Sequence, residues 1–210
     1  TAAVRLQSST SNSTRMVTGG GYPGSSSINV INYVTMSSVG NATDFGDLTV
    51  ARHGNSACSS PTRGLFAGGN ASGNTIDFIE FSTTGNAIDF GDLTSAREAS
   101  RGLSSSTRGV FIGGSSNKVI EFVTIASQGN SIDYGDASAN SEAYGNSAFS
   151  NSVRGVYALG SSDNTTIEYF TINAGGTALD FGDLSQGRIQ VGGASEANGG
   201  LNDGYQGTRF

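Results

Sequence analysis

The sequence repeats itself, and the period of the repeat constrains the fold more than any other feature. The phrase Asp-Phe-Gly-Asp, or Asp-Tyr-Gly-Asp in one copy, occurs four times, with its glycine at Gly46, Gly91, Gly135 and Gly182. Successive copies are therefore 45, 44 and 47 residues apart. A period of this length is typical of arrays in which each repeat is one supersecondary unit packed against its neighbours.

Two further phrases recur in step with the first. An apolar run that opens on Thr-Arg or Val-Arg and closes on glycine lies at 14–21, 62–69, 107–114 and 153–160. An aromatic and β-branched run lies at 28–38, 75–84, 118–127 and 166–174. Each repeat thus offers four strand-length pieces separated by Gly, Asn or Ser turns, and no segment keeps helical apolar spacing over three turns.

The aromatic run carries apolar residues on both of its faces. In the third repeat, Ile120 and Phe122 lie on one parity and Val123 and Ile125 on the other. A strand of this kind is covered on both sides. Four strands in about 45 residues, covered by neighbouring units, predict an all-β fold, a β-propeller of four-stranded blades.

The length of 210 residues corresponds to four full repeats and a remainder. We expect one β-propeller domain over 1–210, with repeats at about 5–51, 52–96, 97–140 and 141–187 and a partial fifth at 188–210. A five-bladed ring with a short last blade is the favoured prediction. A four-bladed ring closed by a C-terminal strand and a segment of a longer array are the alternatives, because repeat arrays must close or cap their ends.

The repeats resemble known families. The runs Phe66 to Gly69 and Phe111 to Gly114 resemble the second strand of the kelch repeat, although the kelch tryptophan is absent. Four aromatic residues stand in its place: Phe45, Phe90, Tyr134 and Phe181. The consensus sequences GNAxDFGDLTxAR and TRGxFxGG also resemble repeats in virion structural and tail-fibre-like proteins of marine bacteriophages. This resemblance extends from about Arg5 to Asp183. This resemblance implies a part of a particle rather than a defined activity.

Charge and composition exclude several classes of protein. The chain has 11 basic and 17 acidic residues and a net charge of −6, which disfavours electrostatic binding of nucleic acid. No run of 18 apolar residues occurs, so we expect no membrane insertion. With Cys58 and His53 as the sole cysteine and histidine, neither an intrachain disulfide nor a cysteine and histidine zinc site can form.

Two sets of charged residues recur in every repeat. The second aspartates of the Asp-Phe-Gly-Asp phrase, which belong to a loop with calcium-like carboxylate spacing, are Asp47, Asp92, Asp136 and Asp183. We favour a structural role in which the aspartates of the phrase accept backbone N–H bonds in a tight turn. The arginines that open the apolar runs are Arg15, Arg63, Arg108 and Arg154. They either form an anion-binding ring or, as we favour, bind an aspartate or backbone carbonyls of the neighbouring blade.

The sequence predicts no catalytic, cofactor-binding or metal-binding residue. His53 is expected in an exposed, variable turn, and no Gly-x-Ser-x-Gly elbow accompanies it. Cys58 aligns with Leu103 and is expected to be a small core residue. Candidate glycan or partner contacts are Tyr144, Tyr157 and Tyr205, whose alternative role is to anchor loops on blade edges. The segments 140–152 and 189–206 are the loops in which recognition is expected.

The resemblance to virion and tail-fibre-like proteins, with no catalytic constellation in the sequence, implies a non-enzymatic structural component of a phage virion or extracellular appendage, in contact with other subunits and self-associating as a homo-oligomer. Its localisation would be the virion or the extracellular space. The alternative is a carbohydrate-binding adhesin or lectin whose loops hold a host surface polysaccharide. No cofactor is expected in either case.

Overall fold

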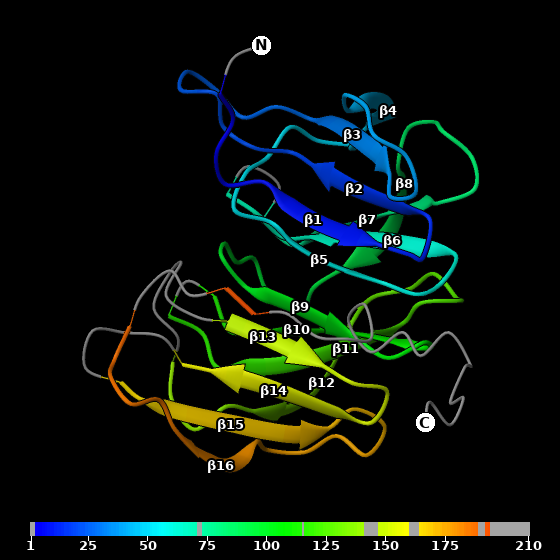
Figure 1. Cartoon of the computed structure of the whole chain (residues 1–210). Helices are drawn as coiled ribbons and strands as arrows, with labels where there is room; N and C mark the ends of the chain where they lie inside the picture. The colour runs from blue at the N-terminus through cyan, green and yellow to red at the C-terminus, as the bar shows by residue number, and fades with distance from the viewer. Residues whose placement is uncertain are drawn as a thin grey trace, which may run out of the picture.

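The computed structural model describes residues 3–70, 73–114, 116–140, 147–159, 164–188 and 192–193. Within these ranges the protein contains strands and no helix, and therefore no helix long and apolar enough to cross a membrane. Sixteen strands form four separate antiparallel sheets of four strands each. Figure 1 shows how these sheets are arranged. The prediction of an all-β, blade-based fold is confirmed.

Each sheet is one chain segment whose strands lie side by side in chain order, and each predicted full repeat contains one sheet. The first two blades are built from β1 (Ser8–Ser11), β2 (Arg15–Gly19), β3 (Val30–Thr35) and β4 (Thr43–Asp47), then β5 (Ser56–Ser59), β6 (Arg63–Ala67), β7 (Thr75–Glu80) and β8 (Ile88–Asp92). The last two are built from β9 (Arg101–Ser104), β10 (Arg108–Ile112), β11 (Val119–Thr124) and β12 (Ile132–Asp136), then β13 (Ser147–Ser150), β14 (Arg154–Ala158), β15 (Thr166–Thr171) and β16 (Leu179–Asp183).

The blades follow one another from the blue end to the orange end of the molecule (Figure 1). Their first strands are the neighbours: β1 contacts β5, β5 contacts β9, and β9 contacts β13. The described residues therefore form an open, propeller-like arc with two end blades. Each end blade has one face that no other described blade covers.

The Asp-Phe-Gly-Asp phrase forms the fourth strand of each blade, which corrects the prediction that it forms a tight turn. Its pairing with the third strand shifts by one residue, for example between Ile31 and Asn32 opposite β4. Gly46 lies beside this bulge with a φ of 147°, a conformation that favours glycine. The phrase is thus a bulged edge strand rather than a connection.

The apolar core lies between blades. One cluster joins Phe45 of β4 to Phe66 of β6 and to Ile79 and Phe81 of the second blade. A second joins the second and third blades, and a third joins the third and fourth. Because both faces of an internal sheet contribute to such clusters, the apolar residues of the third strand occur on both parities.

Candidate functional site

The contacts that recur in this protein are the joints between consecutive blades. In the first joint, Gly85 N–H donates to the carbonyl of Phe45 at 2.7 Å, and Ala87 N–H donates to the carbonyl of Asp47 at 2.8 Å. The Asn86 side-chain oxygen accepts the Asp47 N–H at 3.0 Å. A loop of one blade thus satisfies the open edge of the preceding fourth strand, which would otherwise be a template for aggregation.

The same bonds recur in the next two joints. Gly129 and Ser131 bind the carbonyls of Phe90 and Asp92 in the second joint. Gly176 and Ala178 bind those of Tyr134 and Asp136 in the third. The repeat therefore specifies both halves of a joint, one at each side of the blade.

Glycine is required where these segments touch. A Cβ atom at Gly46 would lie 2.3 Å from the carbonyl oxygen of Gly85, and one at Gly135 would lie 2.2 Å from that of Gly176. At Gly182, the equivalent position of the last blade, a Cβ would meet nothing within 4 Å. The glycine thus serves the joint as well as the bulge, and in the fourth blade the described residues leave its joint unfilled.

The repeated arginines span the joints by donating to carbonyls of the following blade. Arg63 donates from Nη1 to the carbonyls of Ile125 and Ala126 at 3.1 and 2.9 Å. Its guanidinium also lies over the Phe78 ring, 4.8 Å from the centroid, and bonds Glu80 at 2.7 Å. The carboxylate partner belongs to the same blade, so carbonyls rather than an aspartate of the neighbour hold the joint.

Arg15 and Arg108 behave in the same way. Arg15 donates to the Phe81 carbonyl at 2.5 Å, and Arg108 donates to the carbonyls of Ile172 and Asn173 at 3.0 Å each. Among the described residues, the Arg154 guanidinium contacts the Tyr169 ring and no following blade. Arg15, Arg63 and Arg108 therefore donate across the three joints, whereas Arg154 has no following blade among the described residues.

Buried carboxylates form a third element of the joints. Asp77 of β7 accepts the Thr49 N–H at 3.0 Å, the Thr49 hydroxyl at 2.6 Å and the Arg52 guanidinium at 2.7 Å. Both side chains of the Arg52–Asp77 pair are 0% exposed. The carboxylate therefore ties the loop after β4 to the following blade.

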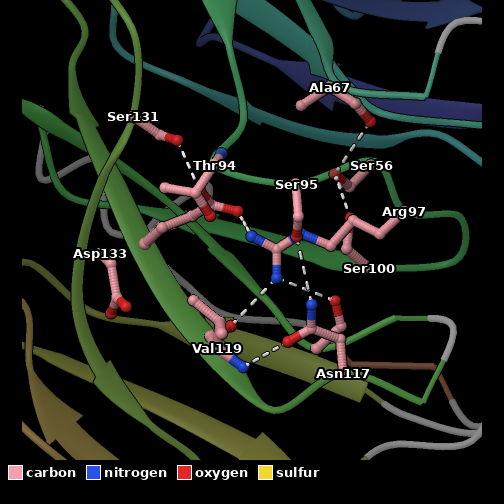
Figure 2. Close-up of polar contacts among 12 residues, drawn as sticks. Ser56, Ala67, Thr94, Ser95, Arg97, Ser100, Asn117, Val119, Ser131 and Asp133 are labelled. Atoms are coloured by element: carbon pink, nitrogen blue, oxygen red, sulfur yellow. Dashed lines mark hydrogen bonds and ion pairs between the residues drawn. The ribbon is translucent and has the colours of Figure 1, made fainter.

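The second joint repeats this arrangement with Arg97 and Glu121, which form a buried ion pair. Glu121 also accepts the Thr94 N–H at 2.7 Å and the Ser131 hydroxyl at 2.5 Å. Figure 2 shows Arg97 reaching toward Val119, whose carbonyl it also bonds. Burial lowers the pKa of Arg97 to about 10, so the guanidinium stays charged at neutral pH.

Sequence analysis missed these carboxylates. Asp77, Glu121 and Glu168 occupy the same position of the third strand, and Glu168 accepts the Ser138 N–H in the third joint. The signal was an acidic residue recurring inside an otherwise apolar run, because such a residue is buried and needs a partner. The first blade has Asn32 at this position.

The predicted aspartates act mainly through their backbones. Asp47, Asp92 and Asp136 contribute peptide groups to the joints, and the Asp183 carboxylate accepts the Thr165 hydroxyl at 2.8 Å. In the last three copies of the phrase the first aspartate accepts the N–H of its glycine, as Asp180 does from Gly182 at 3.1 Å. In the described ranges no group of three or more His, Cys, Asp and Glu side chains could hold a metal ion.

None of the predicted glycan contacts lies in a surface site among the described residues. Tyr157 lies in β14 and is 1% exposed, packed in the core between the third and fourth blades, so its ring cannot stack on a surface sugar. Tyr144 and Tyr205 lie outside the described residues, as do 141–146 of the first candidate recognition segment and all of the second except 192–193. Residues 147–150 of the first segment form strand β13 rather than a loop. Cys58 is buried, and burial raises the pKa of its thiol to about 12, which suits a core residue.

His53 is not in an exposed turn as expected, since its side chain is 14% exposed. Its Nδ1 lies 2.9 Å from the Ser27 hydroxyl, and its Nε2 lies 3.8 Å from a Glu98 carboxylate oxygen. The ring packs on Tyr22 at 5.0 Å between centroids. The second distance exceeds a hydrogen bond, so Glu98 does not hold the ring as the carboxylate of a Ser-His-Asp triad does.

In comparisons with known proteins, no family model and no curated protein matches this chain. The joints between blades, which recur in the same form, are therefore the feature that bears on function.

Proposed function

We propose that the protein is a non-enzymatic structural module of a phage virion or extracellular appendage, in which a kelch-like propeller array supplies a rigid, polar scaffold. The observation that carries the proposal is the use of the repeated polar residues. The arginines and the aspartate phrases of the first three units bind the following unit, and the buried carboxylates of the last three units bind the loop that follows the preceding blade.

Rigidity follows from the chemistry of these joints. Each one combines backbone bonds, an arginine donating to carbonyls and an apolar cluster, and two of them include a buried ion pair. Directional bonds of this kind fix the angle between blades, whereas an apolar contact alone would permit sliding. A scaffold that presents loops in fixed positions gains avidity when several copies assemble.

The resemblance of the repeat sequence to virion and tail-fibre-like proteins of marine bacteriophages supports a location in a virion or appendage. The finer fold that accompanies it is a ring completed beyond the fourth blade, with the segment from Arg188 as the start of a fifth unit. Gly193 supports this part of the proposal, since its position against Ala148 in β13 matches that of Gly102 against Ala57.

The experiment is to purify particles and surface appendages from the source culture on a density gradient and to detect the protein by mass spectrometry and immunogold electron microscopy. We expect the protein in a fixed ratio to a major structural protein of the particle, with gold label at one location. Its absence from particles and appendages, with recovery in the soluble fraction, would overturn the proposal.

The carbohydrate-binding alternative stays a prediction, because Tyr144 and Tyr205 lie outside the described residues. Labelled protein binding to intact bacteria, competed by their extracted polysaccharide, would support it. Alanine at either tyrosine should then weaken the binding.

A further inference from the structure

We propose that the two end faces of the arc that no other described blade covers are the halves of one self-docking interface, so that copies of the chain associate head to tail. The β16 face is formed by Arg154, Phe181, Gly182 and Asp183. The β3 face is formed by Met36 and the loop from Gly40 to Ala42. The inference names the partner of the structural module and rests on the proposed function only for its biological setting.

The backbone halves are complementary. The tripeptide Gly40-Asn41-Ala42 repeats Gly85-Asn86-Ala87, which binds the carbonyls of Phe45 and Asp47 and the Asp47 N–H in the first joint. All three residues are exposed in the first blade. Phe181 and Asp183 are the equivalents of Phe45 and Asp47, so they offer the same two carbonyls and the same N–H to a second copy.

The apolar halves are complementary as well. Phe181 is 54% exposed, whereas its equivalents Phe45 and Phe90 are each 3% exposed beneath the next blade. Met36 is 55% exposed, whereas its equivalent Phe81 is 2% exposed. Both end faces therefore expose side chains that every described internal joint of the same type covers, and removing them from water favours docking.

The arginine of the β16 face has matching acceptors. Arg63 donates to the carbonyls of Ile125 and Ala126, which correspond in the first blade to those of Met36 and Ser37. Docking places these carbonyls at the Arg154 guanidinium, which already lies over the Tyr169 ring, 4.5 Å from the centroid. The ring and the carbonyls then hold it as they hold Arg63.

One element differs and makes this joint weaker than the internal ones. Arg188 occupies the place of Arg52, but the residue facing it would be Asn32 of the second copy, where the internal joint has Asp77. An amide oxygen accepts a guanidinium N–H without neutralising its charge. The β1 strand of the docked copy must also displace Gly193 from Ala148, so head-to-tail docking competes with the start of a fifth unit in the same chain.

Such a contact is heterologous, because different faces of the two copies meet. It leaves one face of each kind free, so it builds either a closed ring or an open filament. This geometry distinguishes it from a symmetric dimer and decides the design of the test.

The experiment is sedimentation velocity of the full chain in a concentration series, with Phe181→Asp on the β16 face and Met36→Asp on the β3 face. We expect concentration-dependent assembly of the natural sequence and monomers of each variant alone. Because each variant keeps one intact face, their mixture should form a heterodimer and nothing larger. The matched control is Ile132→Asp, since Ile132 is 59% exposed but lies on neither end face, and this variant should assemble normally.

A gain-of-function variant makes the test independent of disruption. Asn32→Asp places at this joint the carboxylate that Asp77 provides in the first joint, and it should tighten self-association at least about tenfold. A natural sequence and an Asn32→Asp variant that both stay monomeric would overturn the inference. So would assembly that persists in both face variants, with circular dichroism confirming that they fold.

The outcome is separable from that of the proposed function. A protein found in particles but monomeric in solution refutes the self-docking inference alone. A protein that assembles head to tail but is absent from particles refutes the proposed function alone.

Discussion

Replacing Asp77 with alanine should be among the most destabilising single changes in this protein. The carboxylate accepts three bonds across the first joint, from Arg52 and from both the N–H and the hydroxyl of Thr49. Its removal takes away the carboxylate that pairs directly with the buried Arg52 guanidinium, since both side chains are 0% exposed.

The size of the effect follows from that burial. Breaking a buried ion pair by removing one partner costs about 3–5 kcal/mol, since the remaining charge stays desolvated. Arg52 keeps hydrogen bonds to the carbonyls of Thr75 and Phe66 at 3.2 Å each, which lessens the loss. We therefore expect the free energy of unfolding to fall by about 3 kcal/mol, at the lower end of this range.

The measurement is urea-induced unfolding followed by circular dichroism and by tyrosine fluorescence. The matched control is Lys118→Gln, which removes the exposed ion pair between Lys118 and Asp136, 3.4 Å apart with side chains 47% and 40% exposed. An exposed pair contributes about 0–1 kcal/mol, so the control should differ little from the natural sequence.

A second variant tests the cause of the loss. Replacing the pair together, as Arg52→Met with Asp77→Leu, removes the stranded charge and should recover most of the lost stability. A loss below about 1 kcal/mol for Asp77→Ala, or an equal loss in the double variant, would refute the argument that an unpaired buried charge is responsible.

Three further comparisons test the joints and the core. Gly46→Ala and Gly182→Ala share the strain of a left-handed φ, but only the former places a Cβ against a following blade, so thermal unfolding should show it to be less stable by at least about 1 kcal/mol. Arg63→Gln should cost about 1–2 kcal/mol through two lost carbonyl bonds, whereas Arg154→Gln should cost less than about 0.5 kcal/mol in the monomer, both measured in urea. Cys58 should resist iodoacetamide at pH 8 until urea unfolds the protein, and rapid labelling of the native protein would contradict this. Because folding raises the pKa of the thiol from 9.0 to about 12, its contribution to stability is fully present below pH 9.0 and is lost as the pH rises toward 12.

The architecture could be predicted from the sequence because the period of the repeat is a local property. The spacing of Gly46, Gly91, Gly135 and Gly182 gives the size of the unit. Gly, Asn and Ser turns within the unit divide it into four strands, and antiparallel neighbours need short connections. The sheets of the structure follow this division in all four units.

The roles of individual residues within that architecture are harder to predict from the sequence. The Asp-Phe-Gly-Asp phrase has the composition of a turn, yet it pairs as a strand because a bulge at Gly46 accommodates it and the following blade covers its outer edge. Tyr157 is predicted from the sequence to contact a glycan or a partner, yet it lies in β14 under the neighbouring blade. In both cases the deciding contact comes from another repeat.

The sequence by itself determined the unit, its strands and which residues recur. The tertiary structure decided what those residues bind: Arg63 meets Ala126, which is 63 positions away, and Asp77 meets Arg52 across a joint. It also decided that Phe181 and Met36 stay exposed, although their equivalents are buried. The physical reason is that the pattern of apolar residues along a strand indicates which of its faces are covered. The partner at each face depends on the angle and offset at which one blade packs on the next.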